Sequence, residues 1–335
     1  MVNIAINGFG RIGRLFLRAL SENKSAKNIN VKIINDLADL ESNIHLFKYD
    51  SVHGIYNKKI KNDKNSFDIG LGRTQIISEI NPLKLPWKKN QIDIVIECTG
   101  ILTSKEDSLK HIKAGAKKVI ISAPSDNPDI TVVYGVNSDK LTPDHRIVSN
   151  ASCTTNCLAP VAHVLHEALG IERGFMTTIH SFTGDQRTVD TLHGDLHRAR
   201  TASVSMIPTS TGAARAVGLV LPELEGKLDG TSIRVPTPNV SVIDFKFVPT
   251  KATDIDSVND AIKNASEGKL KGILSTNELP LVSVDFNHNP HSSIFDLAET
   301  QVIESQFVRV MSWYDNEWGF SNRMIDTAKA MGKLL

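Results

Sequence analysis

The sequence contains little cysteine: three residues in 335, at positions 98, 153 and 157. So few cysteines, and an odd number of them, exclude a disulfide-stapled secreted scaffold and favour a reducing cytoplasm. No apolar run approaches the roughly 20 residues that a membrane-spanning helix needs. The opening residues MVNIAINGFG lack the basic segment and cleavage site of a signal peptide. We therefore expect a cytoplasmic protein that makes no membrane contact.

The sequence also lacks an excess of charge of one sign. Lysine and arginine number 38 against 37 acidic residues, a formal net charge of +1. That balance gives no general attraction to nucleic acid or to anionic membranes. The one basic cluster, NKKIKNDKNSF at residues 57–67, is predicted to be a solvated hairpin loop. Without repeats or long linkers, a chain of this length is expected to form two domains.

A glycine-rich turn is the first motif that carries chemistry. Residues 2–6 form a β-branched apolar run, and residues 15–19 begin an apolar pattern at helical spacing. Between them Gly8, Gly10 and Gly13 form G-x-G-x-x-G, whose glycines permit a tight turn, close approach of a pyrophosphate and close helix–strand packing. A strand–helix turn without a ligand is the alternative for the glycines alone.

An acidic residue lies at the distance that this fingerprint requires. The second strand pattern, VKIIND, ends in Asp36. A carboxylate there can accept hydrogen bonds from the adenine ribose hydroxyls and would repel a 2′-phosphate, which favours NAD over NADP. Asp36 can also be a helix N-cap, and the two roles are compatible.

Two further apolar runs alternate with a helix pattern. IDIVIECTG and KKVIISAPS read as buried strands, with SKEDSLKHIKAGA as the helix between them. This alternation predicts a parallel, doubly wound sheet, in which ligands bind at the carboxyl ends of the strands. Thr99, Gly100, Ser122 and Ala123 lie at those ends, so we expect them to line the nicotinamide side of the site.

Two cysteines four residues apart occur in SNASCTTNC. A zinc site would need further ligands that the sequence does not supply, and a disulfide across one helical turn would stabilise little. The residues that follow are helical in pattern, which places Cys153 at a helix N-terminus, where the dipole lowers a thiol pKa. We predict that Cys153 is a nucleophile and that Cys157 is a small buried side chain. A buried structural thiol is the alternative for Cys153, and no metal site is predicted.

At this point the motifs identify a family. NGFGRIGR, SNASCTTNCLAP, HSFTGDQ, STGAA, RVPTPNVSV and SWYDNEWGFSNRM occur in this order. Together they resemble phosphorylating glyceraldehyde-3-phosphate dehydrogenases over essentially the whole chain. The resemblance implies NAD-dependent oxidation and phosphorylation of glyceraldehyde 3-phosphate to 1,3-bisphosphoglycerate, a step of glycolysis and gluconeogenesis. It also implies a cysteine thiohemiacetal, a thioester and a homotetramer.

The resemblance assigns roles to individual residues. It implies that Cys153 attacks the aldehyde and that His180 pairs with the thiolate and then accepts the hydroxyl proton. It implies two anion sites, one with Thr183 and Arg234 and the other with Ser152, Thr154, Arg198, Thr211 and Gly212; Arg200 is an equally charged neighbour of Arg198. For the cofactor, the resemblance implies Arg11, Ile12, Asp36 and Asn316, with Asn316 at the nicotinamide carboxamide. These residues add to those predicted from the pattern, namely Gly8, Gly10, Gly13, Thr99, Gly100 and Ser122.

The sequence departs from the family pattern at a few positions. EINP replaces the frequent ERDP, which puts Ile80 where an adenine-side arginine is common. VDTLHGD carries Thr191 and Leu192 in a loop that approaches a neighbouring subunit's cofactor in the family. Phe320 replaces a usual tyrosine. Erythrose-4-phosphate dehydrogenases share SNASCTTNC and LVSVDFNH, and they are the nearest alternative.

The family resemblance also sets the expected architecture. We expect a Rossmann domain over residues 1–152 and 317–335. An α+β catalytic domain with a mostly antiparallel sheet is expected over residues 153–316. Within the catalytic domain, the polar segment 185–208 has no clear periodicity, and a loop of that length is usually functional.

Overall fold

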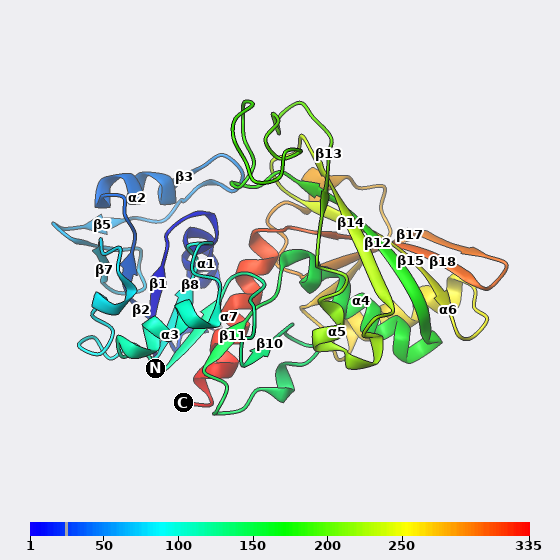
Figure 1. The fold of residues 1–335 in the computed structure, drawn as a ribbon, viewed down its shortest axis with the longest axis horizontal. Coiled ribbons are helices and arrows are strands. Elements are labelled where there is room, and N and C mark those ends of the chain that lie inside the picture. The colour runs from blue at the N-terminus through cyan, green and yellow to red at the C-terminus, as the bar shows by residue number, and fades with distance from the viewer. Residues whose placement is uncertain (24–25) are drawn as a thin grey trace. The chain divides into compact units, whose positions relative to one another are not determined.

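The computed structural model describes residues 1–23 and 26–335, and the chain divides into two compact units (Figure 1). Unit 1 comprises Met1–Tyr134, Ser138–Ser152 and Ser321–Leu335. Unit 2 comprises Gly135–Asn137 and Cys153–Phe320. None of the helices in the described ranges combines the length and apolarity that crossing a bilayer requires.

Unit 1 is built on strands that alternate with helices. Its helices are α1 (Arg11–Glu22), α2 (Leu40–Lys48), α3 (Lys105–Lys113) and most of α7 (Trp318–Gly332). Its strands are β1 (Val2–Asn7), β2 (Ile29–Asn35), β3 (Tyr49–Asp50), β4 (Gly54–Ile55), β5 (Lys61–Asn62), β6 (Ser66–Asp68), β7 (Thr74–Ile77), β8 (Ile94–Glu97), β9 (Lys118–Ile121), β10 (Ile130–Thr131) and β11 (Ile147–Ser149).

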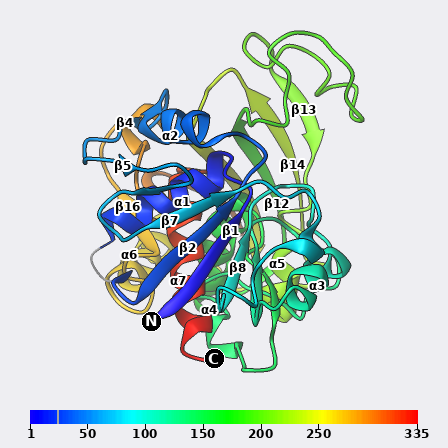
Figure 2. The same cartoon turned by 90° about the vertical axis from the view of Figure 1, so that its left-hand side faces the viewer.

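The sheet of unit 1 has the strand order β10-β11-β9-β8-β1-β2-β7-β6-β5. Pairing is parallel from β10 to β7, and the last two pairs are antiparallel. Strands β8, β1 and β2 lie side by side in Figure 2. The chain leaves β1 toward β2 and later returns to its other side as β8, so the order reverses at β1. The predicted doubly wound α/β fold is confirmed, and the crevice for a ligand is expected at this reversal.

The long segment of unit 2, Cys153–Phe320, begins with the helix whose first residue is Cys153. Its helices are α4 (Cys153–Leu169), α5 (Val217–Val220) and α6 (Ile255–Glu267). Its strands are β12 (Ile171–Ser181), β13 (Ile207–Ser210), β14 (Leu228–Val235), β15 (Ser241–Pro249), β16 (Leu274–Asn277), β17 (Ser293–Ile303) and β18 (Phe307–Tyr314).

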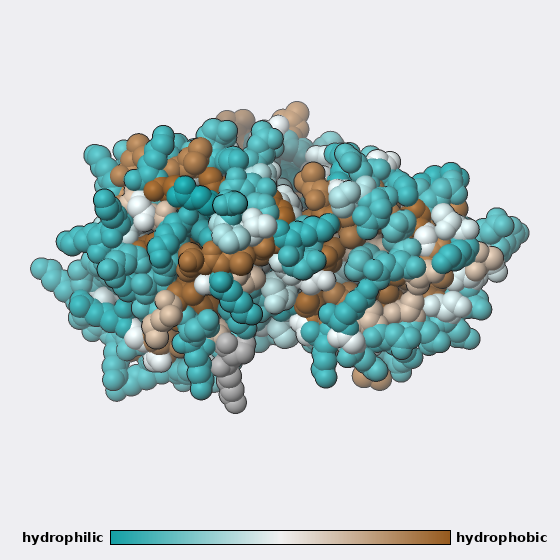
Figure 3. Space-filling model, turned by 90° about the horizontal axis from the view of Figure 1, so that it is seen from below, coloured by the Kyte–Doolittle hydropathy of each residue, from teal (hydrophilic) through white to brown (hydrophobic). Residues whose placement is uncertain are grey.

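The sheet of unit 2 has the order β13-β14-β12-β15-β18-β17-β16. Four of its six strand pairs are antiparallel, and only β12–β14 and β16–β17 are parallel. Helices α4 and α6 pack on each other and on β17. The predicted α+β class is confirmed for this unit. Elsewhere on the molecule, the face drawn in Figure 3 is mainly hydrophilic, with scattered apolar patches.

Candidate active site

Cys153 is the first residue of α4, and a strained turn leads into it. Ala151 has a φ of 56°, in the left-handed region that residues with a Cβ seldom adopt. The Ala151 N–H donates to Ser149 Oγ at 3.1 Å, and Ala151 is buried. Burial and this bond hold a conformation that costs about 1–2 kcal/mol.

His180, near the end of β12, faces the thiol. Its Nε2 lies 3.5 Å from Cys153 Sγ. Its Nδ1 lies 2.7 Å from the Ser181 carbonyl oxygen and 2.8 Å from an Arg234 Nη1, which itself donates to the same carbonyl at 3.0 Å. Nδ1 therefore faces an acceptor, the carbonyl, and a donor, the guanidinium, and both neutral tautomers fit these contacts. The tautomer with the proton on Nδ1 directs the Nε2 lone pair at the thiol, the arrangement that a general base needs.

The electrostatics of the pair differ from the sequence expectation. Burial raises the pKa of the Cys153 thiol, although Arg234 and hydrogen bonds at Thr154 act in the opposite direction. Burial, with the charges of Arg234 and Arg198, lowers the pKa of His180 to about 3. Both shifts favour a neutral thiol beside a neutral imidazole over the expected thiolate–imidazolium pair. The helix dipole was the only effect visible in the sequence, and burial outweighs it here.

Tyr314, which lies far from both residues in the sequence, supports the pair. It ends β18 and is buried. Its hydroxyl hydrogen-bonds Thr154 Oγ1 at 2.8 Å and Thr178 Oγ1 at 2.9 Å. Its ring meets the His180 ring edge-on, with centroids 5.9 Å apart. Tyr314 therefore joins α4 to β12 and restricts the rotation of the imidazole.

Two guanidinium groups supply positive charge near the pair. The charge of Arg198 lowers the pKa values of both His180 and Arg234, after the larger effect of burial, so the two cations act on each other. The Nε of Arg234 is buried and faces no hydrogen-bond partner within residues 1–23 and 26–335. A buried donor of this kind, beside a second cation, suits an anion such as phosphate.

A carboxylate also belongs to this region, which the sequence reasoning did not expect. Arg198 Nη1 donates to Asp185 Oδ2 at 2.9 Å, and its Nε donates to Thr209 Oγ1 at 3.1 Å. Asp185 also lies 3.2 Å from His193 Nε2. Arg198 is therefore partly neutralised. Its neighbour Arg200 is mostly exposed and pairs with Asp190, so the two arginines are not equivalent.

The remaining predicted phosphate ligands occupy three segments. Thr183 follows β12, and its carbonyl accepts from Gln186 N. Thr211 and Gly212 follow β13, and Thr155 in the first turn of α4 donates to Ala213 O at 3.2 Å. That bond brings the segment after β13 to the first turn of α4, where Thr154 lies. Ser152 ends the Ser138–Ser152 segment of unit 1 and precedes Cys153 directly.

Asn316 is held by two serines of unit 2. Ser181 Oγ and Ser241 Oγ donate to Asn316 Oδ1 at 2.8 and 3.1 Å. Ser181 also provides the carbonyl that contacts His180. With Oδ1 accepting twice, the Nδ2 group is left to donate to a carbonyl oxygen. This orientation suits the predicted contact with a nicotinamide carboxamide.

The glycine turn of unit 1 has the features that a pyrophosphate site needs. Gly8 has a φ of 89°, and a Cβ there would lie 2.7 Å from Thr99 N. A Cβ on Gly13 would lie 2.3 Å from the Gly8 carbonyl oxygen. By contrast, a Cβ on Gly10 would meet no atom within 4 Å in the described chain, so space remains above this residue. Gly10 caps α1 without a side chain, as phosphate binding at a helix N-terminus requires.

The two residues after Gly10 begin α1, and their backbone and the Arg11 side chain make different contributions. Arg11 and Ile12 are its first two residues, so their peptide groups lie at the positive end of the helix dipole. The Arg11 guanidinium donates to Asp50 Oδ2 at 2.6 Å and ties α1 to the segment after α2. The side chain of Arg11 therefore has a structural contact, and its predicted role at the pyrophosphate falls to the backbone.

This ion pair predicts a pH-dependent contribution to stability. Burial alone would raise the pKa of Asp50, but hydrogen bonds from the His53 N–H and Arg11 outweigh it and lower the pKa from 3.8 to about 2. A depressed carboxyl pKa stabilises the fold above pH 3.8, and the effect is lost as the pH falls toward 2. We expect Asp50→Asn to cost about 2 kcal/mol at pH 5–7 and roughly half of that at pH 3.

Urea unfolding of the wild type and the variant at pH 7, 5, 4 and 3 measures this difference. The exposed loop residue Asp144 provides the control. The free energy of unfolding of Asp144→Asn should differ little from that of the wild type, and by the same amount at each pH. If the free energies of unfolding of the wild type and Asp50→Asn differ by the same amount at every pH, the proposed contribution of the ionised Asp50 is contradicted.

The other predicted cofactor residues lie at the ends of the parallel strands. Asp36 follows β2; its carboxylate accepts from Phe9 N at 2.7 Å and from Ala38 N at 2.9 Å. Thr99 and Gly100 form the turn after β8, which ends three residues earlier than the predicted run. Ser122 follows β9 and donates its N–H to the Glu97 carbonyl oxygen at 3.0 Å. The structure brings Asp36 to the glycine turn, since Phe9 lies between Gly8 and Gly10.

All three cysteines are free thiols. Cys157 is buried, its Sγ lies 3.3 Å from Ser293 Oγ, and burial raises its pKa to about 12. Burial also raises the pKa of Cys98. Within the described residues, no group of three or more His, Cys, Asp or Glu side chains could hold a metal ion. Of the three thiols, Cys153 alone has a histidine at hydrogen-bonding distance.

The departures from the family pattern lie in contrasting environments. Ile80 is 80% exposed and Leu192 is 90% exposed, whereas Phe320 is buried. The two exposed apolar side chains therefore change the surface, and Phe320 belongs to the core.

Comparison with known proteins gives family matches for both units. Residues 2–105 match the family model described as glyceraldehyde 3-phosphate dehydrogenase, NAD binding domain, and residues 152–316 match that of the C-terminal domain. Proteins named glyceraldehyde-3-phosphate dehydrogenase from Xanthobacter flavus and Cereibacter sphaeroides are 62% and 58% identical over 333 and 334 residues. These alignments cover 99% and 100% of this chain, and 99% of each relative. The Geobacillus stearothermophilus protein of the same name is 53% identical over 328 residues, 98% of this chain and 97% of its own.

Proposed function

The chain belongs to the glyceraldehyde-3-phosphate dehydrogenase family, and NAD is its cofactor. From that premise we propose that it oxidises and phosphorylates glyceraldehyde 3-phosphate to 1,3-bisphosphoglycerate through a thioester on Cys153. The observation that carries this proposal is the 3.5 Å contact between Cys153 Sγ and His180 Nε2 beside the Arg234 guanidinium. A nucleophile, a base and an anion-binding cation are the groups that such an acyl transfer needs.

The first half of the reaction uses the neutral pair. As the Cys153 sulfur forms a bond to the aldehyde carbon, His180 Nε2 accepts the thiol proton and passes it to the carbonyl oxygen, which gives a thiohemiacetal. His180 then removes the hydroxyl proton as the carbon loses a hydride. When bound, NAD accepts that hydride. The carbon is thereby oxidised to a thioester, and His180 holds the proton.

The second half returns the enzyme to its starting state. An oxygen of inorganic phosphate attacks the thioester carbon, the carbon–sulfur bond breaks, and the sulfur leaves as the thiolate, which recovers the proton from His180. Arg234 and Arg198, with Thr154, Thr183, Thr211, Gly212 and Ser152, are proposed to bind the substrate phosphate and the attacking phosphate. Hydroxyls, peptide N–H groups and guanidinium forks are suitable donors for both anions.

The residues of unit 1 fit the cofactor. The open space above Gly10 and the N-terminus of α1 suit the pyrophosphate. Asp36 is proposed to accept from the adenosine ribose hydroxyls, and Thr99, Gly100 and Ser122 to line the nicotinamide side. Asn316 is proposed to hold the carboxamide through its Nδ2 group.

The charge of Asp36 leads to a prediction on cofactor choice. In Asp36→Asn, the amide oxygen can still accept from Phe9 N, but the negative charge that repels a 2′-phosphate is gone. We expect the ratio of kcat/KM for NADP to that for NAD to rise at least about tenfold, chiefly through KM, since one unit of charge acts at short range. Initial rates with each cofactor measure it.

A matched control separates this effect from a general change in charge. Asp39 lies three residues away and caps α2 through Ser42 N. Asp39→Asn removes the same charge at a position that is not assigned to the ribose, and its cofactor ratio should stay within twofold of wild type. Equal changes in the two variants contradict the role of Asp36.

We also propose a cytoplasmic homotetramer. The three free thiols are consistent with a reducing compartment. Segment 185–208 exposes apolar side chains that a second copy could cover, namely Val189, Leu192, Leu196, Val204 and Met206. Sedimentation equilibrium should give about four times the 36.7 kDa of one chain, and a monomer would refute the assembly.

The decisive assay for the reaction follows NADH absorbance with glyceraldehyde 3-phosphate and NAD. We expect sustained turnover with inorganic phosphate, and without phosphate a burst of no more than one NADH per active site. Parallel reactions replace the aldehyde by erythrose 4-phosphate. A preference for the four-carbon sugar, or sustained turnover that does not depend on phosphate, would overturn the proposed function.

A further inference from the structure

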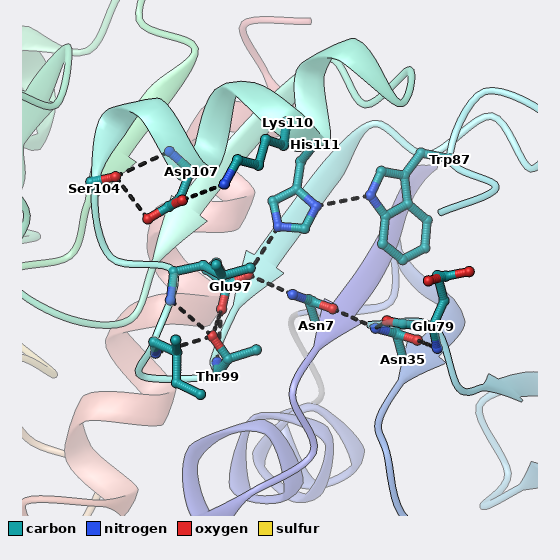
Figure 4. Close-up of polar contacts among 12 residues, drawn as sticks. Asn7, Asn35, Glu79, Trp87, Glu97, Thr99, Ser104, Asp107, Lys110 and His111 are labelled. Carbon is teal, nitrogen blue, oxygen red and sulfur yellow. Dashed lines mark hydrogen bonds and ion pairs between the residues drawn. The ribbon is translucent and has the colours of Figure 1, made fainter. Parts of the chain in front are cut away.

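A chain of buried side chains connects the carboxyl ends of three parallel strands in unit 1 (Figure 4). Asn35, Asn7 and Glu97 are the last residues of β2, β1 and β8. Asn35 Nδ2 donates to Asn7 Oδ1 at 2.8 Å, and Asn7 Nδ2 donates to Glu97 Oε2 at 2.7 Å. The three side chains are 6%, 3% and 1% exposed. They lie directly before Asp36, Gly8 and the Cys98–Gly100 turn, which are the cofactor loops.

Glu97 is the centre of this chain and accepts four hydrogen bonds. Its Oε2 accepts from Asn7 and contacts His111 Nε2 at 2.9 Å. Its Oε1 accepts from Thr99 N at 2.8 Å and from Thr99 Oγ1 at 2.5 Å. Thr99 Oγ1 in turn accepts from the N–H groups of residues 101 and 102, which closes the turn. A buried carboxylate is costly unless its acceptors are satisfied, and here all of its acceptor positions are used.

The direction of each hydrogen bond is fixed at the ends of the network. The Glu79 N–H donates to Asn35 Oδ1 and its carbonyl accepts from Asn35 Nδ2, so this amide, and Asn7 after it, can point only one way. The Trp87 indole, which can only donate, reaches His111 Nδ1 at 3.1 Å.

The fixed directions of these hydrogen bonds determine which side chain can occupy position 97. Since Nδ1 of His111 accepts from Trp87, the ring proton is on Nε2 and points at Glu97. The Thr99 peptide N–H is a third donor whose identity cannot change. Every neighbour therefore presents a donor to position 97, and only an ionised carboxylate accepts from all of them.

The two cofactor loops are also in direct contact. A Cβ on Gly8 would lie 2.7 Å from Thr99 N and 2.8 Å from the Cys98 carbonyl carbon, so the glycine turn packs against the backbone that Glu97 holds. A shift of the Thr99 turn would displace Gly8, and a shift of Asn7 would displace it from the other side. Glu97 bonds to both.

We infer that Glu97 is a positioning residue for the dinucleotide. It fixes the glycine turn and the Thr99 turn relative to each other without itself contacting the cofactor, and His111 and Trp87 fix its orientation. The inference extends the proposed NAD-binding role of Gly8, Thr99 and Gly100. Preorganised loops lower the ordering cost of binding, so loss of this carboxylate should weaken binding.

Glu97→Gln tests this role with almost no change in volume. Every partner of position 97 is a hydrogen-bond donor. The NH₂ group of the glutamine must therefore face either Thr99 or the Asn7 and His111 side chains, donor against donor. We expect the dissociation constant for NAD, measured by calorimetry without aldehyde, to rise at least tenfold. Hydrogen exchange in a peptide covering residues 98–102 should become faster in the free enzyme. The rate of Cys153 alkylation by iodoacetamide should stay within twofold, because the thiol belongs to unit 2.

The control is Thr74→Val, which removes a buried hydrogen bond to the Val31 carbonyl oxygen in the same sheet, away from these turns. It should lower Tm without changing NAD affinity by more than twofold. If Glu97→Gln does not fold, Trp87→Phe decides, because loss of the indole donor should raise the NAD dissociation constant two- to fivefold. Unchanged affinity in the folded variant, or an equal loss in Thr74→Val, overturns the inference. Binding is measured without the aldehyde, so a failure of the proposed reaction would leave this result intact.

Discussion

Replacing Cys153 by alanine is expected to abolish phosphate-dependent NAD reduction, with a loss in kcat of at least about 10⁴-fold. The proposed reaction passes through a covalent bond to this sulfur, and among the described residues neither of the other two thiols has a recorded contact with a histidine. Cys157 lies in the same helix, but it is buried and its pKa is raised to about 12. Steady-state assays with glyceraldehyde 3-phosphate, together with calorimetry for NAD, measure the effect. NAD affinity should be retained, since the variant leaves unit 1 intact.

Cys157→Ser is the control for this experiment. A serine hydroxyl at this position can keep a hydrogen bond to Ser293 Oγ, the present partner of the Cys157 sulfur. We expect its kcat to stay within about threefold of wild type. A Cys153→Ala enzyme that keeps even a tenth of the activity would exclude the covalent route.

His180→Asn is expected to lower kcat by about 10²–10⁴-fold, the usual contribution of a general acid–base residue. Asparagine keeps a polar group in the pocket but has no nitrogen lone pair to accept the proton from the thiol or from the thiohemiacetal. The KM for NAD should change little. Because burial and Arg234 lower the pKa of His180 to about 3, the imidazole of the free enzyme stays unprotonated throughout pH 5–9.

His163 offers a matched control on α4, the helix of Cys153. It lies 3.6 Å from Glu167 and is not placed in the site. His163→Asn should keep kcat within twofold. A pre-steady-state burst in His180→Asn that is as fast as in wild type would show that proton transfer to this residue is not part of the oxidation.

The sequence predicted the parts of the fold that depend on local pattern. The glycine spacing, the apolar runs of β1, β2, β8 and β9 and the helical period of α3 and α4 each have a local cause, and the structure confirms the α/β and α+β classes. Strand ends were less accurate. The run through Gly100 was read as one strand, whereas β8 ends at Glu97 because the Glu97 carboxylate turns the backbone through its bonds to Thr99.

The sequence could not predict contacts between residues far apart in the chain. Asp185 and Arg198 are separated by 13 positions in a loop without periodicity, so their ion pair was not foreseen. Tyr314 is 160 residues from Thr154, and no local pattern links the two. The residues around Glu97 in the sequence indicate only an acidic residue at the end of a strand. They do not reveal that its carboxylate bonds to both the glycine turn and the Thr99 turn.

The pKa shifts of the site also depend on contacts that the sequence does not show. The helix N-terminus before Cys153 is visible in the sequence and lowers a thiol pKa. The burial of the thiol and the closeness of Arg234 to His180 depend on tertiary structure, and together they favour the neutral pair. The sequence therefore named Cys153 and His180 as candidates, and it could not show the burial that shifts the pKa values of both groups toward their neutral forms.

Mass spectrometry of the acyl-enzyme tests the central claim most directly. The full-length protein is mixed with NAD and glyceraldehyde 3-phosphate in phosphate-free buffer, quenched in acid, digested and analysed for the peptide that contains Cys153. The account predicts one 3-phosphoglyceroyl group on Cys153, formed together with one NADH and removed when inorganic phosphate is added before the quench. An unmodified Cys153 peptide alongside a full NADH burst, or an adduct that phosphate does not remove, would contradict it.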